Sequence, residues 1–224
     1  MSLDSTPPVI AIDGPSASGK GTVAAQVAEA LGFRYLDSGA LYRLVAMAAL
    51  EARAGLDDED ALAGVAGRMR VEFRDGRIWL DGRDVTAAVR GEEVGAAASQ
   101  VAAKPRVRKA LLVRQRAFRT PPGLVADGRD MGSVVFPDAP LKVFLTAGVD
   151  TRAERRYKQL KEKGMYAKMG DVVEELRRRD ERDTSRPVAP LKHYPDAIFL
   201  DTTGLSVDAA VRQILGWWRE TSQG

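Results

Sequence analysis

The chain has 224 residues, 45% of them hydrophobic and 29% charged, which suits a globular fold with a sizeable buried core. The lack of cysteine excludes disulfides, thiol nucleophiles and cysteine-bound metals, and a single histidine, His193, excludes a histidine metal cluster. The net charge of +3 is only mildly basic, and the apolar runs fall short of the roughly 18 residues that cross a bilayer. We expect no membrane segment and, because the first residues lack the pattern of a secretory signal, a cytoplasmic protein.

Short apolar runs rich in β-branched residues alternate with helical patterns along most of the chain. Runs of this kind suit strands buried on both faces of a parallel sheet, and they occur at 9–13, 124–128, 141–147 and 197–201, with 34–36 as a further short strand. Helical periodicity is found at 22–31, 40–54, 106–118, 151–163, 172–183 and 207–219. The alternation predicts an α/β fold with an open parallel sheet of about five strands flanked by helices. Ligands bind such sheets at the carboxyl ends of the strands.

The segment 71–85 breaks this alternation. Three short strand patterns are joined there by Asp75-Gly76 and Asp81-Gly82, dipeptides that favour tight hairpin turns because both central residues take positive φ. An antiparallel meander does not join a parallel sheet easily, so we expect an inserted module at about 61–103, with a helix on each side of the meander. The remaining core would be 1–60 and 104–224, and the first eight residues, 1–8, would lie outside the fold.

The stretch GPSASGKGT, 14–22, follows the first strand and opens the first helix, which is the order of a phosphate-binding loop. Gly14 and Gly19 would let backbone N–H groups turn inward, while Lys20 reaches the β and γ phosphates of a nucleotide. Gly21 stands where the common pattern has a Mg²⁺-binding hydroxyl, so we expect Mg²⁺ to be held mainly by phosphate oxygens and water rather than by protein ligands. The predicted nucleotide-binding residues, which would hold ATP if the chain is a kinase, are Gly14, Pro15, Ser16, Ala17, Ser18, Gly19, Lys20, Gly21 and Thr22.

Three later segments carry candidate residues for a second substrate. LDSGALYR, 36–43, follows the second strand, with Ser38 as a candidate N-cap and Arg43 one turn into a helix. ADGRDMG, 126–132, sets Asp127 and Asp130 around Arg129 at the carboxyl end of a buried strand, which favours a site over a plain turn. RRRDERDTSRPVAPL, 177–191, is either a solvated helix end or an arginine-rich lid. Arginines without a histidine base suit phosphoryl transfer, which needs positioning and charge neutralisation more than a strong base.

The segments IDGPSASGKGT, LDSGALYR, AASQVAAKPRVR, ADGRDMGSVVFPDA and RDERDTSRPVAPL resemble, in this order, those of bacterial cytidylate kinases. The resemblance covers nearly the whole chain, and DGRDMG and SQVAA are its most specific parts within the nucleoside monophosphate kinases. It implies a P-loop kinase fold with a small antiparallel β insert in the acceptor-binding domain and a short lid at about 155–187. It also implies transfer of the γ-phosphoryl group of ATP to CMP or dCMP, with Mg²⁺. We expect small-molecule substrates, a monomer, and neither nucleic-acid nor membrane partners.

The resemblance further implies roles for the matching residues. Asp130 would accept a hydrogen bond from the cytosine amino group, where uracil presents a carbonyl, and Arg43 and Arg129 would clamp the CMP phosphate in bidentate fashion. Asp183 would bind ribose hydroxyls. The CMP-binding residues implied are Ser38, Arg43, Ser99, Arg108, Arg129, Asp130, Arg179, Asp183 and Arg186. The catalytic residues implied are Lys20, Arg129 and Arg186.

Two classes of alternative stay open. Another small P-loop kinase, similar to adenylate or shikimate kinase, would share the loop, although shikimate kinase needs no cytosine-reading carboxylate. A regulatory GTPase would carry an N-K-x-D motif, which this chain lacks. A nucleic-acid-binding NTPase would need a more continuous basic surface with aromatic residues between the basic ones.

Overall fold

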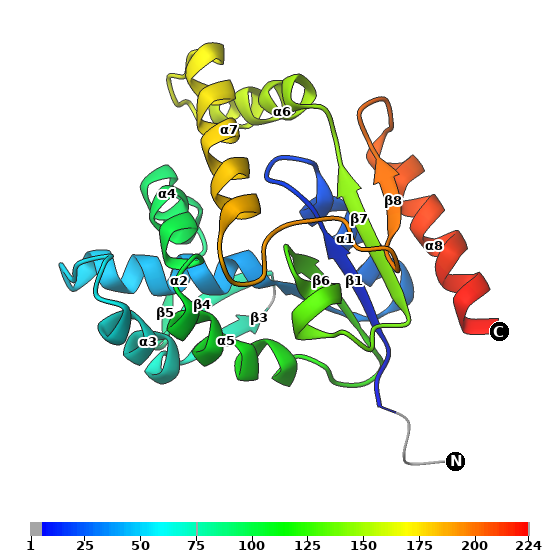
Figure 1. Ribbon diagram of the computed structural model, residues 1–224, viewed down its shortest axis with the longest axis horizontal. Helices are drawn as coiled ribbons and strands as arrows, with labels where there is room; N and C mark the ends of the chain where they lie inside the picture. Colours follow the sequence, from blue (N-terminus) through cyan, green and yellow to red (C-terminus); the bar gives the residue numbers. More distant parts are fainter. Residues whose placement is uncertain (1–5, 75, 224) are drawn as a thin grey trace. The chain divides into compact units, whose positions relative to one another are not determined.

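The computed structural model describes residues 6–74 and 76–223, which divide into two compact units (Figure 1). The first unit is Met1–Leu36 with Phe118–Gly224, and the second is Asp37–Ala117. The predicted module at 61–103 lies within the second unit. No helix among the described residues is long and apolar enough to cross a membrane.

A five-stranded sheet forms the centre of the first unit, in the order β2-β6-β1-β7-β8. The strand β1 pairs in parallel with β6 and with β7, and β7 pairs in parallel with β8. This confirms the predicted parallel sheet. The strand bounds are Val9–Asp13 for β1, Arg34–Asp37 for β2, Leu124–Gly128 for β6, Leu141–Thr146 for β7 and Ile198–Asp201 for β8. Every residue of β1 and of β6 is buried, as expected of central strands that are covered on both faces.

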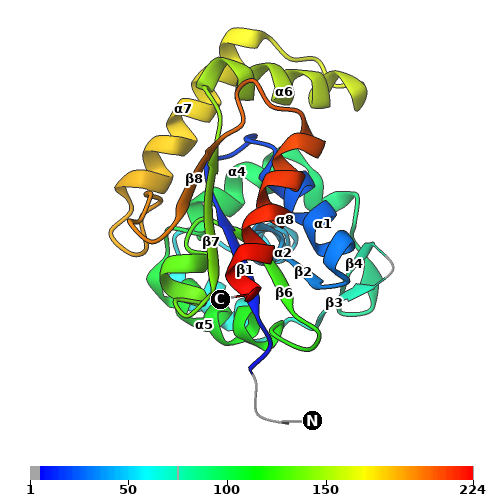
Figure 2. The ribbon, with the colours of Figure 1, turned by 90° about the vertical axis from the view of Figure 1, so that its right-hand side faces the viewer.

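Helices cover this sheet and extend beyond its carboxyl end. Figure 2 shows α1 and α8 side by side over one face, where Trp217 and Trp218 pack against the core cluster. Figure 1 shows α6 beyond the carboxyl end of β7, with α7 returning from it. A smaller apolar cluster of Ala153, Leu160, Val172 and Leu176 joins these two helices. The helix bounds are Lys20–Leu31 for α1, Val149–Glu162 for α6, Met169–Ser185 for α7 and Val207–Gln223 for α8.

The second unit contains the predicted meander. Its strands β3, β4 and β5 form a separate antiparallel sheet, with Asp81 and Gly82 at φ 49° and 81° in the second turn, as this hairpin type requires. In the first turn Gly76 has φ 70°, and Asp75 lies outside the described residues. The helices α3 and α4 flank the meander as expected. The bounds are Ser38–Glu51 for α2, Glu59–Arg68 for α3, Val71–Arg74 for β3, Arg77–Leu80 for β4, Arg83–Asp84 for β5, Glu92–Val101 for α4 and Pro105–Ala117 for α5.

Two local predictions were wrong. The N-cap of α2 is Asp37, whose carboxylate accepts a hydrogen bond from the Ala40 N–H at 3.1 Å, and Ser38 is instead the first helical residue. The carboxylate at the end of β2 reaches that N–H from one residue earlier in the chain. Pro7 and Pro8 are tied to the fold, because the Pro7 carbonyl accepts from Arg119 at 2.6 Å and the Pro8 carbonyl accepts from the Leu124 N–H at 2.9 Å. The preceding residues, 1–5, lie outside the described part of the chain.

Candidate functional site

The phosphate-binding loop takes a backbone path that requires glycine at its first position. Gly14 has φ 155°, and a Cβ built there would lie 1.9 Å from the carbonyl oxygen of Leu145, so no side chain fits. Gly19 has φ 89° and directly precedes α1. The helix therefore begins at Lys20, two residues before its predicted start, and its first N–H groups lie at the end of the loop.

Donors from two later segments bind the carbonyl groups of this loop. Arg155 of α6 donates from Nη1 to the Ser18 carbonyl at 2.8 Å, and the hydroxyl of Thr202, after β8, donates to the same oxygen at 3.2 Å. Arg152 donates to the Ser16 carbonyl at 3.3 Å. The protein itself thus holds the loop in shape, which limits the conformational entropy that a nucleotide must remove on binding.

Lys20 and Gly21 both face a buried carboxylate. The Lys20 Nζ lies 3.5 Å from the Asp127 Oδ1, and the Tyr35 hydroxyl donates to the Asp127 Oδ2 at 3.3 Å. A Cβ on Gly21 would lie 3.1 Å from that same Oδ2, closer than side-chain carbons normally approach. The serine or threonine of the common loop pattern would therefore crowd Asp127. Glycine after the lysine avoids this close approach.

The residues around the loop suit a magnesium ion bound mainly by the nucleotide. Among residues 6–74 and 76–223, no group of three or more His, Cys, Asp or Glu side chains could hold a metal. Gly21 offers no hydroxyl, and Asp127 is already engaged by Lys20 and Tyr35. Mg²⁺ usually keeps several waters and takes substrate phosphates as ligands. These residues fit such an ion, because none of them has to replace its phosphate and water ligands.

Arg129 connects the loop to helix α7. Its Nη2 donates to the Ser16 hydroxyl at 2.8 Å, and its Nε donates to the Asp183 Oδ2 at 2.8 Å. Burial favours the neutral form of Asp183, but the Arg129 guanidinium, with the charges of Arg179 and Arg186, outweighs burial and holds the pKa of Asp183 below its ordinary value. Burial likewise opposes the charge of Arg129, yet the attraction of Asp183 leaves the pKa of Arg129 raised. The pair is a fixed, ionised unit beside the loop.

Asp130, Arg179 and Arg186 lie near the Arg129–Asp183 pair in the first unit. The Arg186 Nη2 lies 3.8 Å from the Asp130 Oδ1, and both side chains are almost fully buried. The Arg186 Nε donates to the Ala189 carbonyl at 2.6 Å, and the positive charge of Arg179 also lowers the pKa of Asp183. The first unit therefore brings the loop, the segment 127–130 and the end of α7 together.

The other four candidates lie in the second unit. Arg43 of α2 donates from Nη1 to the carbonyls of Val89 and Gly91 at 3.2 and 3.3 Å. Arg108 of α5 donates to the Ala102 carbonyl at 3.1 Å, and its guanidinium carbon lies 5.7 Å from the centre of the Tyr42 ring. Two serines of this unit are buried, Ser38 and Ser99. That these four residues act on the same ligand as the first-unit residues stays a prediction.

Sequence reasoning missed several residues that support the loop. Arg152 and Arg155, in the segment TRAERRYK at 151–158, were not among the candidate residues. The first of them is buried and pairs with Asp180 of α7 at 2.6 Å. The available signal was position, because both arginines fall in the first two turns of the helix that follows a central strand. Asp13 was also missed, although it ends the first strand directly before the loop.

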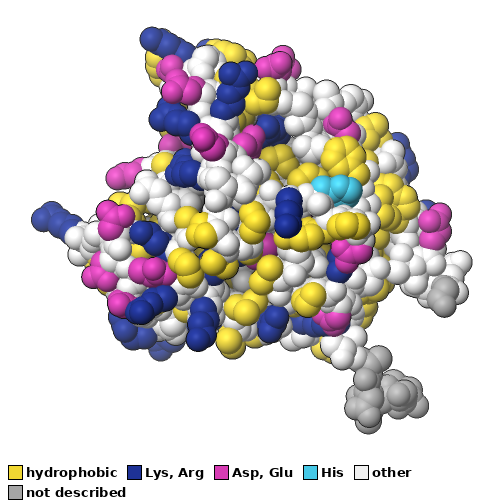
Figure 3. Space-filling view, viewed as in Figure 1, with side chains coloured by type: hydrophobic (Ala, Val, Ile, Leu, Met, Phe, Trp, Pro, Cys, Tyr) yellow, Lys and Arg dark blue, Asp and Glu magenta, His cyan; other side chains and the backbone are white. Residues whose placement is uncertain are grey.

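The contacts of His193 are with two aromatic rings and a backbone carbonyl. Its ring lies 5.6 Å from that of Phe144 and 5.5 Å from that of Phe199, and its Nε2 lies 2.7 Å from the Ala197 carbonyl oxygen. Figure 3 shows the histidine on the surface with hydrophobic side chains around it. The contacts give it no role in the chemistry of the loop.

Asp13 is a buried carboxylate with an unusual pKa. Burial raises its pKa from 3.8 to about 7, the N–H groups of Gly132 and Met131 offset part of this rise, and the charges of Asp130 and Asp127 add to it. Folded Asp13 thus binds its proton more tightly than unfolded Asp13. Its stabilising contribution is complete below pH 3.8 and is lost as the pH rises through 7.

We predict that replacing Asp13 by Asn removes this pH dependence. Between pH 4 and pH 7.5 the wild-type free energy of unfolding should fall, relative to that of Asp13→Asn, by up to roughly 4 kcal/mol, since one pKa unit corresponds to about 1.4 kcal/mol. Urea unfolding of both proteins at a series of pH values measures the difference. Parallel stability curves would contradict the raised pKa.

The family model and the curated relatives agree on one family. A family model described as cytidylate kinase matches residues 10–220. The cytidylate kinase of Chromobacterium violaceum is 58% identical over 215 residues, which cover 96% of this chain and 97% of that protein. Those of Paraburkholderia phymatum and Nitrosomonas europaea are 59% and 55% identical, over 95% of this chain and 93% and 96% of theirs. The similarity therefore includes both compact units.

Proposed function

Because this chain belongs to the cytidylate kinase family, we propose that it transfers the γ-phosphoryl group of ATP to CMP or dCMP, giving ADP and CDP or dCDP. The acceptor is itself a phosphate, so the reaction needs little general-base assistance. The enzyme has to align two polyanions and neutralise the charge that builds on the transferred group. Small-molecule nucleotides are its substrates, and other small P-loop kinase activities are disfavoured by the family assignment.

The phosphate-binding loop, residues 14–22, would hold ATP. Its backbone N–H groups and the N-terminus of α1 would stabilise the negative charge of the phosphates. Lys20 would leave its ion pair with Asp127 and bind the β and γ phosphates instead. Bound Mg²⁺ would neutralise phosphate charge. Arg129 and Arg186 would neutralise the transferred group from the acceptor side, as part of the catalytic set.

The acceptor would be read by three kinds of contact. Asp130, with Ser99 and Arg108, would meet the cytosine edge. The phosphate would be bound by Arg43 and Arg129, and the ribose hydroxyls by Asp183. Arg179 and Arg186 would reach the acceptor from the lid side, and Ser38 would be a further CMP contact. We keep the module at 61–103 as the acceptor-binding insert and the segment at about 155–187 as a short lid, both as proposals.

One observation carries this assignment more than any other. A single, largely buried guanidinium, that of Arg129, is bonded both to Ser16 of the phosphate-binding loop and to Asp183 of α7, and Asp130 follows it directly in the chain. The groups that we assign to the ATP side and to the acceptor side thus contact one cation. A phosphoryl group passing from one substrate to the other would travel beside that cation, which supports transfer between two phosphates.

The decisive experiment presents ATP and Mg²⁺ with CMP, dCMP, UMP, AMP and shikimate in separate assays that detect ADP. We expect CMP or dCMP to give the highest kcat/KM. Fastest turnover of AMP or shikimate would instead favour another small P-loop kinase. We further propose a cytoplasmic monomer without nucleic-acid or membrane partners, which sedimentation and a salt-dependent RNA filter-binding assay can check.

Replacing Asp130 by Asn should weaken base recognition selectively. Asn presents both a donor and an acceptor where the cytosine amino group needs an acceptor, and losing a buried polar partner costs on the order of 1 to 3 kcal/mol. We therefore expect kcat/KM for CMP to fall about 10- to 100-fold while KM for ATP stays nearly unchanged. An unaltered ratio of CMP to UMP turnover would remove Asp130 from base recognition.

A further inference from the structure

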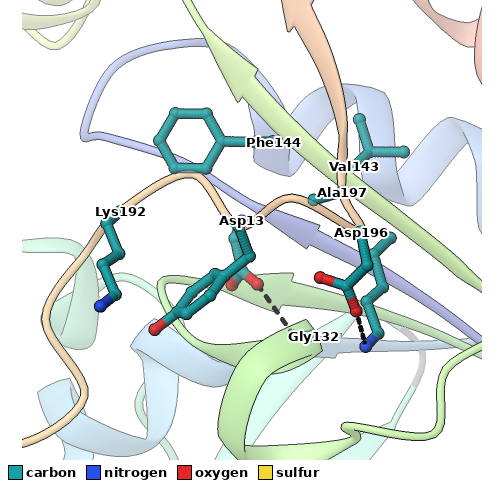
Figure 4. A pocket seen from close by; sticks show the side chains of 9 residues that line it. Asp13, Gly132, Val143, Phe144, Lys192, Asp196 and Ala197 are labelled. Atoms are coloured by element: carbon teal, nitrogen blue, oxygen red, sulfur yellow. Dashed lines mark hydrogen bonds and ion pairs between the residues drawn. The ribbon is translucent and has the colours of Figure 1, made fainter.

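Asp13 forms a clamp between the central strand and the segment that carries Asp130. It is the last residue of β1, and its side chain points across the sheet end, as Figure 4 shows. Its Oδ1 accepts from the Met131 N–H at 2.8 Å, and its Oδ2 accepts from the Gly132 N–H at 2.9 Å. The two carboxylate oxygens thus hold two consecutive N–H groups, those directly after Asp130.

The clamped backbone is the start of a short π-helical turn, Met131–Val135, for which Asp130 is the N-cap residue. The Asp130 side chain makes no cap hydrogen bond there, so the carboxylate of Asp13 takes that place from another strand. Gly132 also lies close against the sheet, since a Cβ on it would be 3.1 Å from the Lys142 side chain and 3.4 Å from the Ala11 Cβ. The turn can therefore neither lift from β1 nor slide along it without breaking these contacts.

The hydrogen bonds of Asp13 also restrain Asp130, the residue proposed to recognise the base. The Asp130 carbonyl accepts from the Val134 N–H at 2.9 Å, and the next N–H, that of Met131, donates to Asp13. Both polar groups of the peptide bond after Asp130 are therefore held by hydrogen bonds. Asp130 itself has φ −151° and ψ 25°, outside the regular helical and strand regions. Without the clamp the chain could relax from that conformation, and the Asp130 carboxylate would shift.

We propose, on the basis of the function proposed above, that Asp13 is a positioning residue for pyrimidine recognition, holding Asp130 where it distinguishes cytosine from uracil. Asp13 need not touch either substrate. It acts by fixing the Met131 and Gly132 N–H groups, for which it needs two acceptor oxygens, as in the carboxylate form that predominates above pH 7. Its position directly before Gly14 raises the competing possibility that it shapes the ATP loop instead.

The substitution Asp13→Asn, assayed at about pH 8 where wild-type Asp13 is mostly ionised, tests the two possibilities. Asn is nearly the same size, but its NH₂ group faces one of the two N–H groups, so one hydrogen bond is lost and two donors oppose each other. We expect KM for CMP to rise about tenfold or more and the kcat/KM preference for CMP over UMP to fall at least about fivefold, because small misplacements at a site have effects of this size. KM for ATP should stay within about twofold.

Asp58→Asn is the matched control. Asp58 caps α3 by accepting from the Ala61 N–H at 2.9 Å, so the same carboxylate-to-amide change is made at another cap in an exposed setting. It should leave the CMP to UMP preference unchanged. Equal increases in the KM values of ATP and CMP in Asp13→Asn would overturn the proposal in favour of a role in the ATP loop, and an unchanged CMP to UMP preference would overturn it as well.

Amide hydrogen exchange gives a readout that does not depend on activity. In the wild-type enzyme the Met131 and Gly132 amides should exchange slowly, and Asp13→Asn should speed their exchange more than that of the Gly14–Gly19 peptide. Rapid wild-type exchange at these two amides would overturn the clamp even if the variant did not fold. If the wild type failed to phosphorylate CMP, the proposed function would fall, while slow exchange that depends on Asp13 would still identify the clamp.

Discussion

Replacing Lys20 by Met is expected to lower kcat by about 100- to 1000-fold, the usual effect of removing one preorganised donor to a developing anion. The side chain of Met keeps most of the length and apolar bulk of Lys20 but cannot follow the phosphates. The effect should appear in kcat at saturating ATP and CMP, because the charge on the transferred group peaks in the transition state. A kcat within about tenfold of the wild-type value would rule out the role given to Lys20.

This loss must be separated from a change in stability. Lys20→Met leaves the Asp127 carboxylate without the ammonium that lies 3.5 Å away, in a setting where both side chains are mostly buried. Asp127 keeps the Tyr35 hydroxyl as a partner, yet the variant should be less stable. The double variant Lys20→Met/Asp127→Asn removes that buried charge. We expect it to regain thermal stability without regaining activity, whereas recovery of activity would show that Lys20 acts only on the fold.

Replacing Arg129 should have the second large effect. Arg129→Lys keeps the positive charge but cannot bond Ser16 and Asp183 together, because its single ammonium lacks the planar fork of guanidinium. We expect kcat/KM for CMP to fall about 100-fold, and somewhat more in Arg129→Ala. The measurement is steady-state kinetics with both substrates varied. A Lys variant with wild-type kcat/KM would exclude a bidentate contact to phosphate.

Two further variants separate a loss of activity from a loss of stability. Arg119 forms a similar pair in the first unit, with Nη1 2.6 Å from the Asp138 carboxylate and Nε donating to a backbone carbonyl, so Arg119→Lys is the control and should leave kcat/KM unchanged. Arg129→Ala strands the buried Asp183, which costs roughly 3 to 5 kcal/mol when a buried pair loses one partner. Adding Asp183→Asn should recover part of that stability but none of the activity.

Most of the sheet and the loop could be predicted from local patterns. Strands buried on both faces read as continuous apolar runs, and the bounds of β1 and β6 match the predicted 9–13 and 124–128. The meander at 71–85 could also be predicted, because its turns need residues that tolerate positive φ. Helix ends were predicted less well, as Asp37 and not Ser38 caps α2.

The sequence by itself thus determined the alternation of strands and helices, the loop at 14–22 and the candidate residues, because each depends on neighbours within a few turns of chain. Only the tertiary structure decided which distant residues meet. Asp13 binds N–H groups more than 100 residues away, and the carboxylate of Asp127 limits the space beside Gly21. These contacts follow from a sheet order that places β1 between β6 and β7, which no local periodicity encodes.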